Sequence, residues 1–173
     1  MKNWTTVEVL RHARHDWLNK IQLVKGYASL NKLDNIKGIV DEIIQEARQE
    51  SMLSNLNLPQ FAELLLTYNW HAKYFQIEYE ILNVDASKLP NDETLSNWMS
   101  HFLERLEKAI SNFGDNQLYI RLDTSTSVVR FNFEFSGTIN NIEMLDHWFK
   151  EQGEDSIVVH HLTPSAFEVD VLF

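Results

Sequence analysis

Side chains that can take and give a phosphoryl group are gathered in the run from Arg11 to Gln22, which reads R-H-A-R-H-D-W-L-N-K-I-Q. A helix turns about 100° per residue, so the residues four before, four after and seven after His15 lie within about 40° of it. These are Arg11, Asn19 and Gln22. His15 therefore lies at the middle of the polar face of a predicted amphipathic helix. The plain alternative is a surface histidine on an ordinary helix, because exposed histidines are common.

The residues around His15 suit phosphoryl transfer, which needs a nucleophile, an in-line approach and positive charge beside the phosphoryl oxygens. A neutral imidazole is a good acceptor near pH 7, because its unperturbed pKa is about 6.5. Asp16 can bond the second ring nitrogen and fix the tautomer. Asn19 can orient the ring or donate to a phosphoryl oxygen, and Arg11 and Arg14 can offset the charge of a phosphohistidine.

Two parts of such a reaction are missing from the chain, namely a carboxylate that exchanges the phosphoryl group and a magnesium ion. A partner protein has to supply both. We expect Arg11, Leu18 and Gln22, which lie beside His15, to contact that partner. We expect this chain itself to bind no cofactor and no metal. His12 with Asp16 and His160 with His161 are the pairs that could ligate a metal, but neither has a third ligand that the sequence can place.

The face opposite His15 is apolar and carries Leu10, Ala13, Trp17, Ile21, Val24 and Ala28. Thr5 or Thr6 can cap this helix, Glu8 is placed for a capping box with Thr5, and the helical period continues to about Leu30. A second helix, from about residue 35 to 55 with Asp34 as its N-cap, has an apolar stripe of its own. A short turn between them predicts a helical hairpin.

A hairpin alone leaves one side of each apolar stripe uncovered. Pairing two hairpins about a two-fold axis covers both stripes in a four-helix bundle. Each Trp, Ile, Val or Leu buried in this way contributes roughly 1.5–3 kcal/mol. We therefore expect a homodimer. The alternative is that the hairpin packs on the C-terminal half of its own chain, but that half has enough apolar elements for its own core.

The rest of the chain predicts a second domain of mixed elements. The segment 54–59 ends in Pro59, which suits the first turn of a new helix, so we expect a hairpin domain at 1–57 and a second domain at 58–173. Helices are expected at about 59–74, 94–112 and 141–152. Strands are expected at 76–84, 117–123, 128–135, 157–162 and 167–172. Helices on one face of a mostly antiparallel sheet make this an α+β sandwich.

Composition excludes several functions. The net charge of −10 argues against nucleic acid and anionic membranes, and the absence of cysteine excludes disulfides, thiolate nucleophiles and Cys-based metal sites. The N-terminus lacks a signal-peptide core, and no run of about 18 apolar residues is present. We expect a cytoplasmic protein.

The motif His15-Asp16-x-x-Asn19, followed by a hairpin and an α+β domain, resembles the phosphoacceptor region of sensor histidine kinases. The wider run R-H-D-W-L-N-K-I-Q-L-V-K-G, with E-S-M-L-S-N-L and T-Y-N-W downstream, is similar to the sporulation initiation phosphotransferase B family. The similarity covers essentially the whole chain. It implies a dimeric four-helix bundle and a C-terminal domain related to kinase ATPase domains.

The resemblance also implies a phosphorelay function. In this family the histidine takes a phosphoryl group from the aspartate of a single-domain response regulator. It then passes the group to a second regulator, a transcription factor that starts sporulation. His15 would be the phosphoacceptor, and Arg14, Asp16, Asn19 and Gln22 match its surroundings. Magnesium would be supplied by the response regulator.

The nucleotide motifs of related kinases are degenerate in this sequence. Lys108 stands where such kinases have a metal-binding asparagine, and the segment 135–139 lacks the aspartate and second glycine of an adenine-binding D-x-G-x-G. We therefore expect no ATP use. The alternatives are an ATP-using kinase core and a non-catalytic module that binds a regulator.

Overall fold

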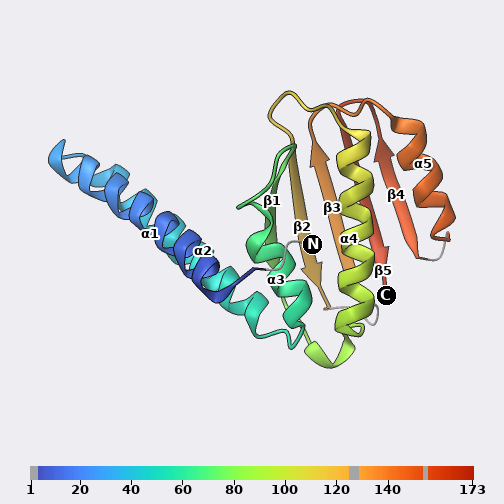
Figure 1. Cartoon of the computed structure of the whole chain (residues 1–173), viewed down its shortest axis with the longest axis horizontal. Helices are drawn as coiled ribbons and strands as arrows, with labels where there is room; N and C mark the ends of the chain where they lie inside the picture. The colour runs from blue at the N-terminus through green and yellow to red at the C-terminus, as the bar shows by residue number, and fades with distance from the viewer. Residues whose placement is uncertain (1–3, 125–128, 154–155) are drawn as a thin grey trace. The chain divides into compact units, whose positions relative to one another are not determined.

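The computed structural model describes residues 4–124, 129–153 and 156–173, and divides into two compact units, Met1–Met52 and Leu53–Phe173. Figure 1 shows the elements of both units. The second unit begins inside the second helix because Leu53 and Leu56 are buried in its core.

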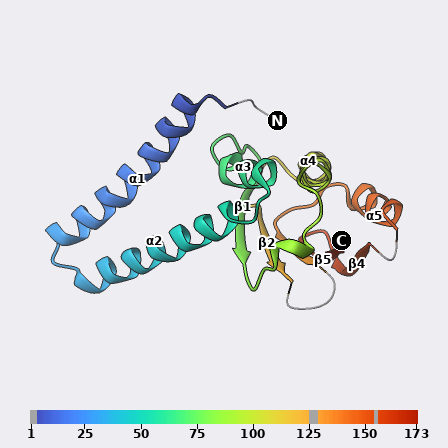
Figure 2. The same cartoon turned by 90° about the horizontal axis from the view of Figure 1, so that it is seen from below.

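The first unit is a helical hairpin. Helix α1 spans Thr6–Ser29 and helix α2 spans Leu33–Ser54, joined by a short turn in which Asn31 has a positive φ of 53° (Figure 2). The capping box is confirmed, since the Glu8 amide donates to Thr5 Oγ1 and the Thr5 amide donates to the Glu8 carboxylate. The prediction of Asp34 as N-cap is wrong, because α2 begins at Leu33 and Asp34 lies in its first turn.

Three helices and a short 3-10 turn belong to the second unit. They are α3 (Pro59–Tyr68), η1 (Ala86–Lys88), α4 (Asp92–Ala109) and α5 (Ile142–Glu151). Asn91 caps α4 through its side chain. The carboxylate of Asp92 accepts from the amides of Gln60 and Phe61, which satisfies donors in the first turn of α3.

Five strands form one sheet in the order β1-β2-β3-β5-β4. Their bounds are β1 Gln76–Ile81, β2 Gln117–Asp123, β3 Arg130–Ser136, β4 Ile157–Leu162 and β5 Ala166–Leu172. Strands β1 and β2 are parallel, and the other pairs are antiparallel. The predicted start of β3, Val128, lies outside the described residues.

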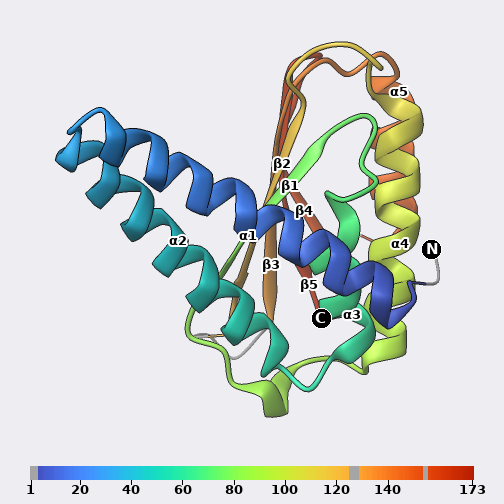
Figure 3. The ribbon, with the colours of Figure 1, turned by 60° about the vertical axis from the view of Figure 1, so that its left-hand side comes forward.

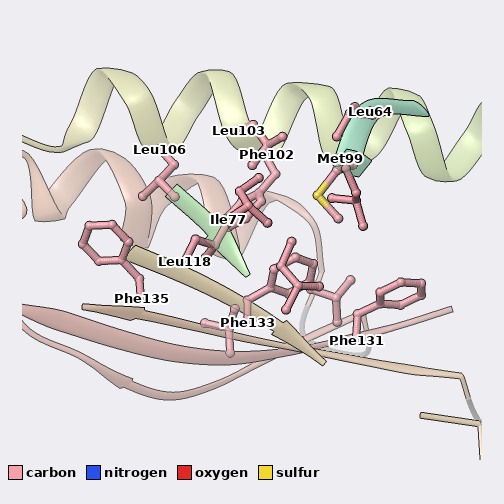
Figure 4. Packing of buried hydrophobic residues seen from close by; sticks show 14 of the residues in the cluster. Leu64, Ile77, Met99, Phe102, Leu103, Leu106, Leu118, Phe131, Phe133 and Phe135 are labelled. Carbon is pink, nitrogen blue, oxygen red and sulfur yellow. The ribbon is translucent and has the colours of Figure 1, made fainter. Parts of the chain in front are cut away.

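The core fills the layer between the helices and one face of the sheet (Figure 4). Phe102 of α4 packs against Phe133 with ring centroids 4.9 Å apart, and against Trp148 of α5 at 5.7 Å. The fold is therefore α+β, with an N-terminal helical hairpin and a five-stranded sheet covered on one face by helices. None of the described helices is long and apolar enough to cross a membrane.

Candidate functional site

His15 projects from the middle of α1 into solvent. Its side chain is 71% exposed, and that of Asp16 is 48% exposed. The helix places it one turn from Asn19, whose Nδ2 lies 3.3 Å from His15 Nδ1. Asp16 Oδ1 lies 3.5 Å from the same nitrogen. The three residues of the H-D-x-x-N motif are thus brought into contact.

Both contacts involve Nδ1, and they leave the other ring nitrogen accessible. Among the residues that the structure describes, none bonds Nε2 of His15. The oxygen and nitrogen of an asparagine side-chain amide exchange places when the amide is flipped by 180°. Asn19 can therefore present its oxygen, in place of its nitrogen, to His15 Nδ1. Asp16 and Asn19 would then both accept from a proton on Nδ1, and the lone pair of Nε2 would point outward.

The other predicted site residues lie on the exposed surface of the same helix. Arg11, Arg14 and Gln22 are exposed, and the side chain of Leu18 is also open to solvent, with an exposed fraction of 50%. Two cationic side chains, Arg11 and Arg14, thus lie exposed within four residues of His15.

Contacts between the two helices hold α1 in place beside α2. Lys20 of α1 donates to the carboxylate of Glu46 of α2, and its ammonium also lies 5.9 Å from the ring centroid of Trp17. On the N-terminal side, His12 packs edge-on against Trp4 at 5.1 Å between ring centroids. The Lys20–Glu46 bond joins α1 to α2, whereas the contacts of Trp17 and Trp4 lie within residues 4–29.

A surface groove that the sequence did not reveal continues along α1 from the histidine. It is lined by Asn19, Gln22, Leu23, Gly26, Tyr27 and Leu30. A Cβ atom added to Gly26 would meet no other atom of the described residues within 4 Å, so the helix backbone is accessible there. The groove could have been predicted from the spacing of positions 19, 22, 26 and 30. These positions are three to four residues apart and therefore share the helix face of His15.

The apolar stripe of α1 is covered only in part by α2. Ala13 and Val24 are half-buried, whereas the exposed fractions of Leu10, Trp17 and Ile21 are 55%, 51% and 56%. On α2, Val40 and Ile44 are 39% and 43% exposed. A single hairpin therefore leaves an apolar face on each of its helices.

The degenerate nucleotide motifs lie in the second unit. Lys108 is exposed in the last turn of α4, and residues 135–139 cover the end of β3 and the turn after it. His160 Nε2 lies 3.0 Å from Asp170 Oδ2, and His161 Nδ1 lies 3.7 Å from Glu168. No group of three or more His, Asp or Glu in the described ranges is placed to hold a metal.

Family models match both halves of the chain. One described as "Sensor_kinase_SpoOB-type, alpha-helical domain" matches residues 1–56. Another, described as "Sporulation initiation phospho-transferase B, C-terminal", matches residues 57–170.

A curated relative and two solved structures are similar to the chain. Sporulation initiation phosphotransferase B of Bacillus subtilis (strain 168) is 37% identical over 118 residues, which are 68% of this chain and 62% of the relative. The histidine kinase AdeS of Acinetobacter baumannii has a TM-score of 0.44 at 10% identity, covering 91% of this chain and 97% of that one. A bacterial phosphotransferase has a TM-score of 0.41 at 12% identity, covering 98% of each chain.

The two family models together span residues 1–170, and the phosphotransferase model alone matches more than half of the chain. The chain belongs to the sporulation initiation phosphotransferase B family.

Proposed function

We propose that the chain is a histidine phosphotransferase of a phosphorelay, with His15 as the residue that carries the phosphoryl group. The observation that supports this most is the state of the His15 ring. Its Nδ1 is held by Asp16 and Asn19, while Nε2 lies open on an exposed helical face. The curated relative is named a phosphotransferase, which agrees with this chemistry.

The transfer is a pair of in-line displacements at phosphorus. In the first, the lone pair of His15 Nε2 attacks the aspartyl phosphate of a donor response regulator. The Nε2–P bond forms, and the P–O bond to the aspartate breaks and leaves a carboxylate. In the second, the carboxylate of another regulator attacks the same phosphorus and releases the imidazole. Here that acceptor is a transcription factor that controls sporulation.

The residues around His15 have separate parts in this scheme. Asp16 accepts a hydrogen bond from Nδ1–H and offsets the positive charge that the ring takes on when Nε2 bonds to phosphorus. Arg11 and Arg14 face the anionic aspartyl phosphate, and Leu18 and Gln22 extend the surface that the regulator contacts. Each regulator supplies Mg²⁺ for its own aspartate, so the chain needs no metal of its own.

The proposal includes a homodimer. Leu10, Trp17 and Ile21 on α1, with Val40 and Ile44 on α2, form the uncovered apolar face of the hairpin. Two copies of this face, packed about a two-fold axis, make a four-helix bundle. His15 lies on the far side of α1 from this face, so both copies of the histidine remain accessible.

The deciding experiment is to mix the protein with a response regulator carrying ³²P on its aspartate. We expect an acid-labile, base-stable label on the wild-type chain, and no label on His15→Ala. His71→Ala is the matched control, since this exposed histidine lies in the second unit and should leave labelling unchanged. Addition of an unphosphorylated second regulator should then discharge the label.

The two alternatives differ from the proposal in the source of the label and in whether the chain is labelled. An ATP-using kinase core would label His15 from γ-³²P-ATP and Mg²⁺ without any regulator. A non-catalytic module would bind the regulator and acquire no label at all. Either outcome would refute the proposed phosphotransferase.

A further inference from the structure

One face of the five-stranded sheet is not covered by the helices of its own unit. Helices α3, α4 and α5 all lie on the opposite side, as Figure 3 shows in a view that is nearly edge-on to the strands. On β2 and β3 the side chains of the open face are polar, and they alternate with apolar side chains buried in the core. Its carboxylates outnumber its arginines: Glu78, Glu80, Asp123, Glu134, Glu168 and Asp170 against Arg121 and Arg130.

A row of directly paired residues crosses all five strands on this face. Glu78 pairs with Tyr119, and Tyr119 pairs with Glu134. Glu134 in turn pairs with Glu168, and Glu168 pairs with His161. The carboxylates of Glu134 and Glu168 are therefore directly opposite each other on neighbouring strands, where like charges repel.

The neighbours of these two glutamates compensate their charges only in part. Arg121 Nη1 lies 3.4 Å from Glu134, but the same guanidinium donates through Nε to Glu80 at 3.1 Å. Glu168 accepts from the neutral amide of Asn132 at 3.2 Å. His161 adds positive charge near Glu168 only when it is protonated.

Beside these carboxylates, the buried Asn132 has an acceptor atom that lacks a donor. The residue is 8% exposed, and its Nδ2 donates to Glu168 and to Asp170 on β5. Its Oδ1 has no hydrogen-bond partner among the residues that the structure describes. This face thus contains acceptors in excess of the donors that it supplies.

A groove of about 330 Å³ lies over the row. Glu78, Tyr119, Glu134, Glu168 and His161 line it, and so we name it the five-strand groove. Ser136 and Ala166, which pair with each other across β3 and β5, also line the groove.

We infer that the five-strand groove binds an arginine side chain presented by an extended segment of a partner protein. A guanidinium has a planar fork of N–H donors that can bridge two carboxylates, here those of Glu134 and Glu168. The ring of Tyr119 already accepts a guanidinium, since Arg121 Cζ lies 5.4 Å from its centroid. The positive charge of the ligand would relieve the repulsion between the two glutamates.

The test is a titration of the ¹⁵N-labelled full chain, followed by NMR, with the capped peptide Gly-Arg-Gly-Arg-Gly. We expect saturable shifts of the amide signals of Glu78, Tyr119, Glu134, Ser136 and Glu168. The same peptide with citrulline in place of arginine keeps the shape and loses the charge. It should bind at least about tenfold more weakly, as charge-assisted hydrogen bonds predict.

Paired variants separate this groove from the general attraction of an acidic chain for cations. Glu134→Gln with Glu168→Gln should weaken binding by at least about tenfold. Glu63→Gln with Glu104→Gln removes the same charge from exposed positions on α3 and α4 and should change affinity less than about twofold. Equal weakening by both pairs, equal affinity for the citrulline peptide, or the absence of saturable shifts would overturn the inference.

Discussion

At the scale of single residues, His15 owes its proposed reactivity to the two side chains at its Nδ1. Asp16 Oδ1 lies 3.5 Å and Asn19 Nδ2 lies 3.3 Å from that nitrogen. Of the two side chains, Asp16 carries the negative charge. Asp16 is half exposed, so water screens part of its effect. Loss of the Asp16 charge should therefore slow transfer moderately, whereas loss of His15 should abolish it.

We predict that Asp16→Asn slows phosphoryl transfer by about tenfold, which corresponds to about 1.4 kcal/mol in barrier height. The amide keeps the shape of the side chain but loses the charge that stabilises a positive imidazole. Quench-flow measurement of the phosphohistidine from a labelled regulator would give the rate. Asp34→Asn, an equal change of charge at the other end of the hairpin, should leave the rate unchanged.

A second prediction at this scale concerns Asp170 on the open face of the sheet. Burial raises the pKa of its carboxyl, but hydrogen bonds from Asn132 and His160 and the charge of Arg130 outweigh this effect and lower the pKa below its usual value. A carboxyl with a lowered pKa in the folded state stabilises the fold above its unfolded pKa, about 3.9, and loses this contribution as pH falls through the folded pKa.

Asp170→Asn should therefore lower the free energy of unfolding at pH 7 by about 1–3 kcal/mol. The difference between wild type and variant should shrink as the pH falls below about 4. Urea unfolding of both proteins at pH 7, 5 and 3, with tryptophan fluorescence as the signal, measures this. A difference that stays constant over this range would show that the charge of Asp170 is not what stabilises the fold.

At the scale of elements, the sequence predicted the type of each helix and strand, and the structure shifts several of their ends. The periodic pattern of α3 continues past Tyr68 and predicts a helix to about residue 74. The helix ends at Tyr68 because the side chain of Asn69 bonds both the N–H and the C=O of Ile77 in β1. Such long-range competition leaves no local signal in the sequence.

The order of the strands in the sheet could not be predicted from the sequence either. Nothing in the pattern of Gln76–Ile81 tells that it pairs in parallel with β2, since strand propensity is the same for either direction. At the candidate site, the H-D-x-x-N spacing placed His15 on the polar face of the helix. The groove beyond Asn19 and the bond between Lys20 and Glu46 depend on side-chain geometry that one helix alone does not specify.

The turn after β3 shows how one element depends on a glycine. Gly137 has a φ of +154°, and a Cβ added there would lie 2.1 Å from Asn116 Oδ1. That oxygen accepts from the Thr138 amide, while Asn116 Nδ2 donates to the carbonyls of Tyr74 and Ser111. Asn116 thus holds three segments together directly against the glycine.

We predict that Gly137→Ala lowers the free energy of unfolding by more than about 2 kcal/mol, because strain and the loss of a buried hydrogen bond add. Gly114→Ala is the matched control. Its φ is also positive, at +112°, but no atom lies within 4 Å of its Cβ position, so it reports backbone strain alone. Thermal unfolding of both variants would show the difference, and equal losses would contradict the role given to Asn116.

At the scale of the whole molecule, the proposed dimer follows from the exposed apolar face of the hairpin. Trp17→Glu places a charge at the centre of that face, and we predict that it converts the dimer to a monomer in analytical ultracentrifugation. Leu23→Glu is the control, since Leu23 is just as exposed, at 54%, but lies about 120° around the helix from Trp17. Leu23→Glu should remain a dimer, and a dimeric Trp17→Glu would refute the proposed interface.

The two proposed sites lie in different units of the chain. The phosphoacceptor lies in Met1–Met52, whereas the five-strand groove lies wholly in Leu53–Phe173. Each unit has its own kind of surface, an apolar stripe beside a reactive histidine in one and an acidic groove in the other. Variants of the groove should therefore leave the chemistry at His15 unchanged in the transfer experiment.

No residue of α1 is buried within a single chain. If the hairpin of a second copy supplies the missing contacts, α1 is stabilised only when two chains associate. The fraction of chains with a stable α1 then depends on protein concentration. The share of chains that can take a phosphoryl group would then rise with the number of copies in the cell. Halving expression would reduce relay throughput by more than half, and a threshold in signal flow would arise from assembly alone.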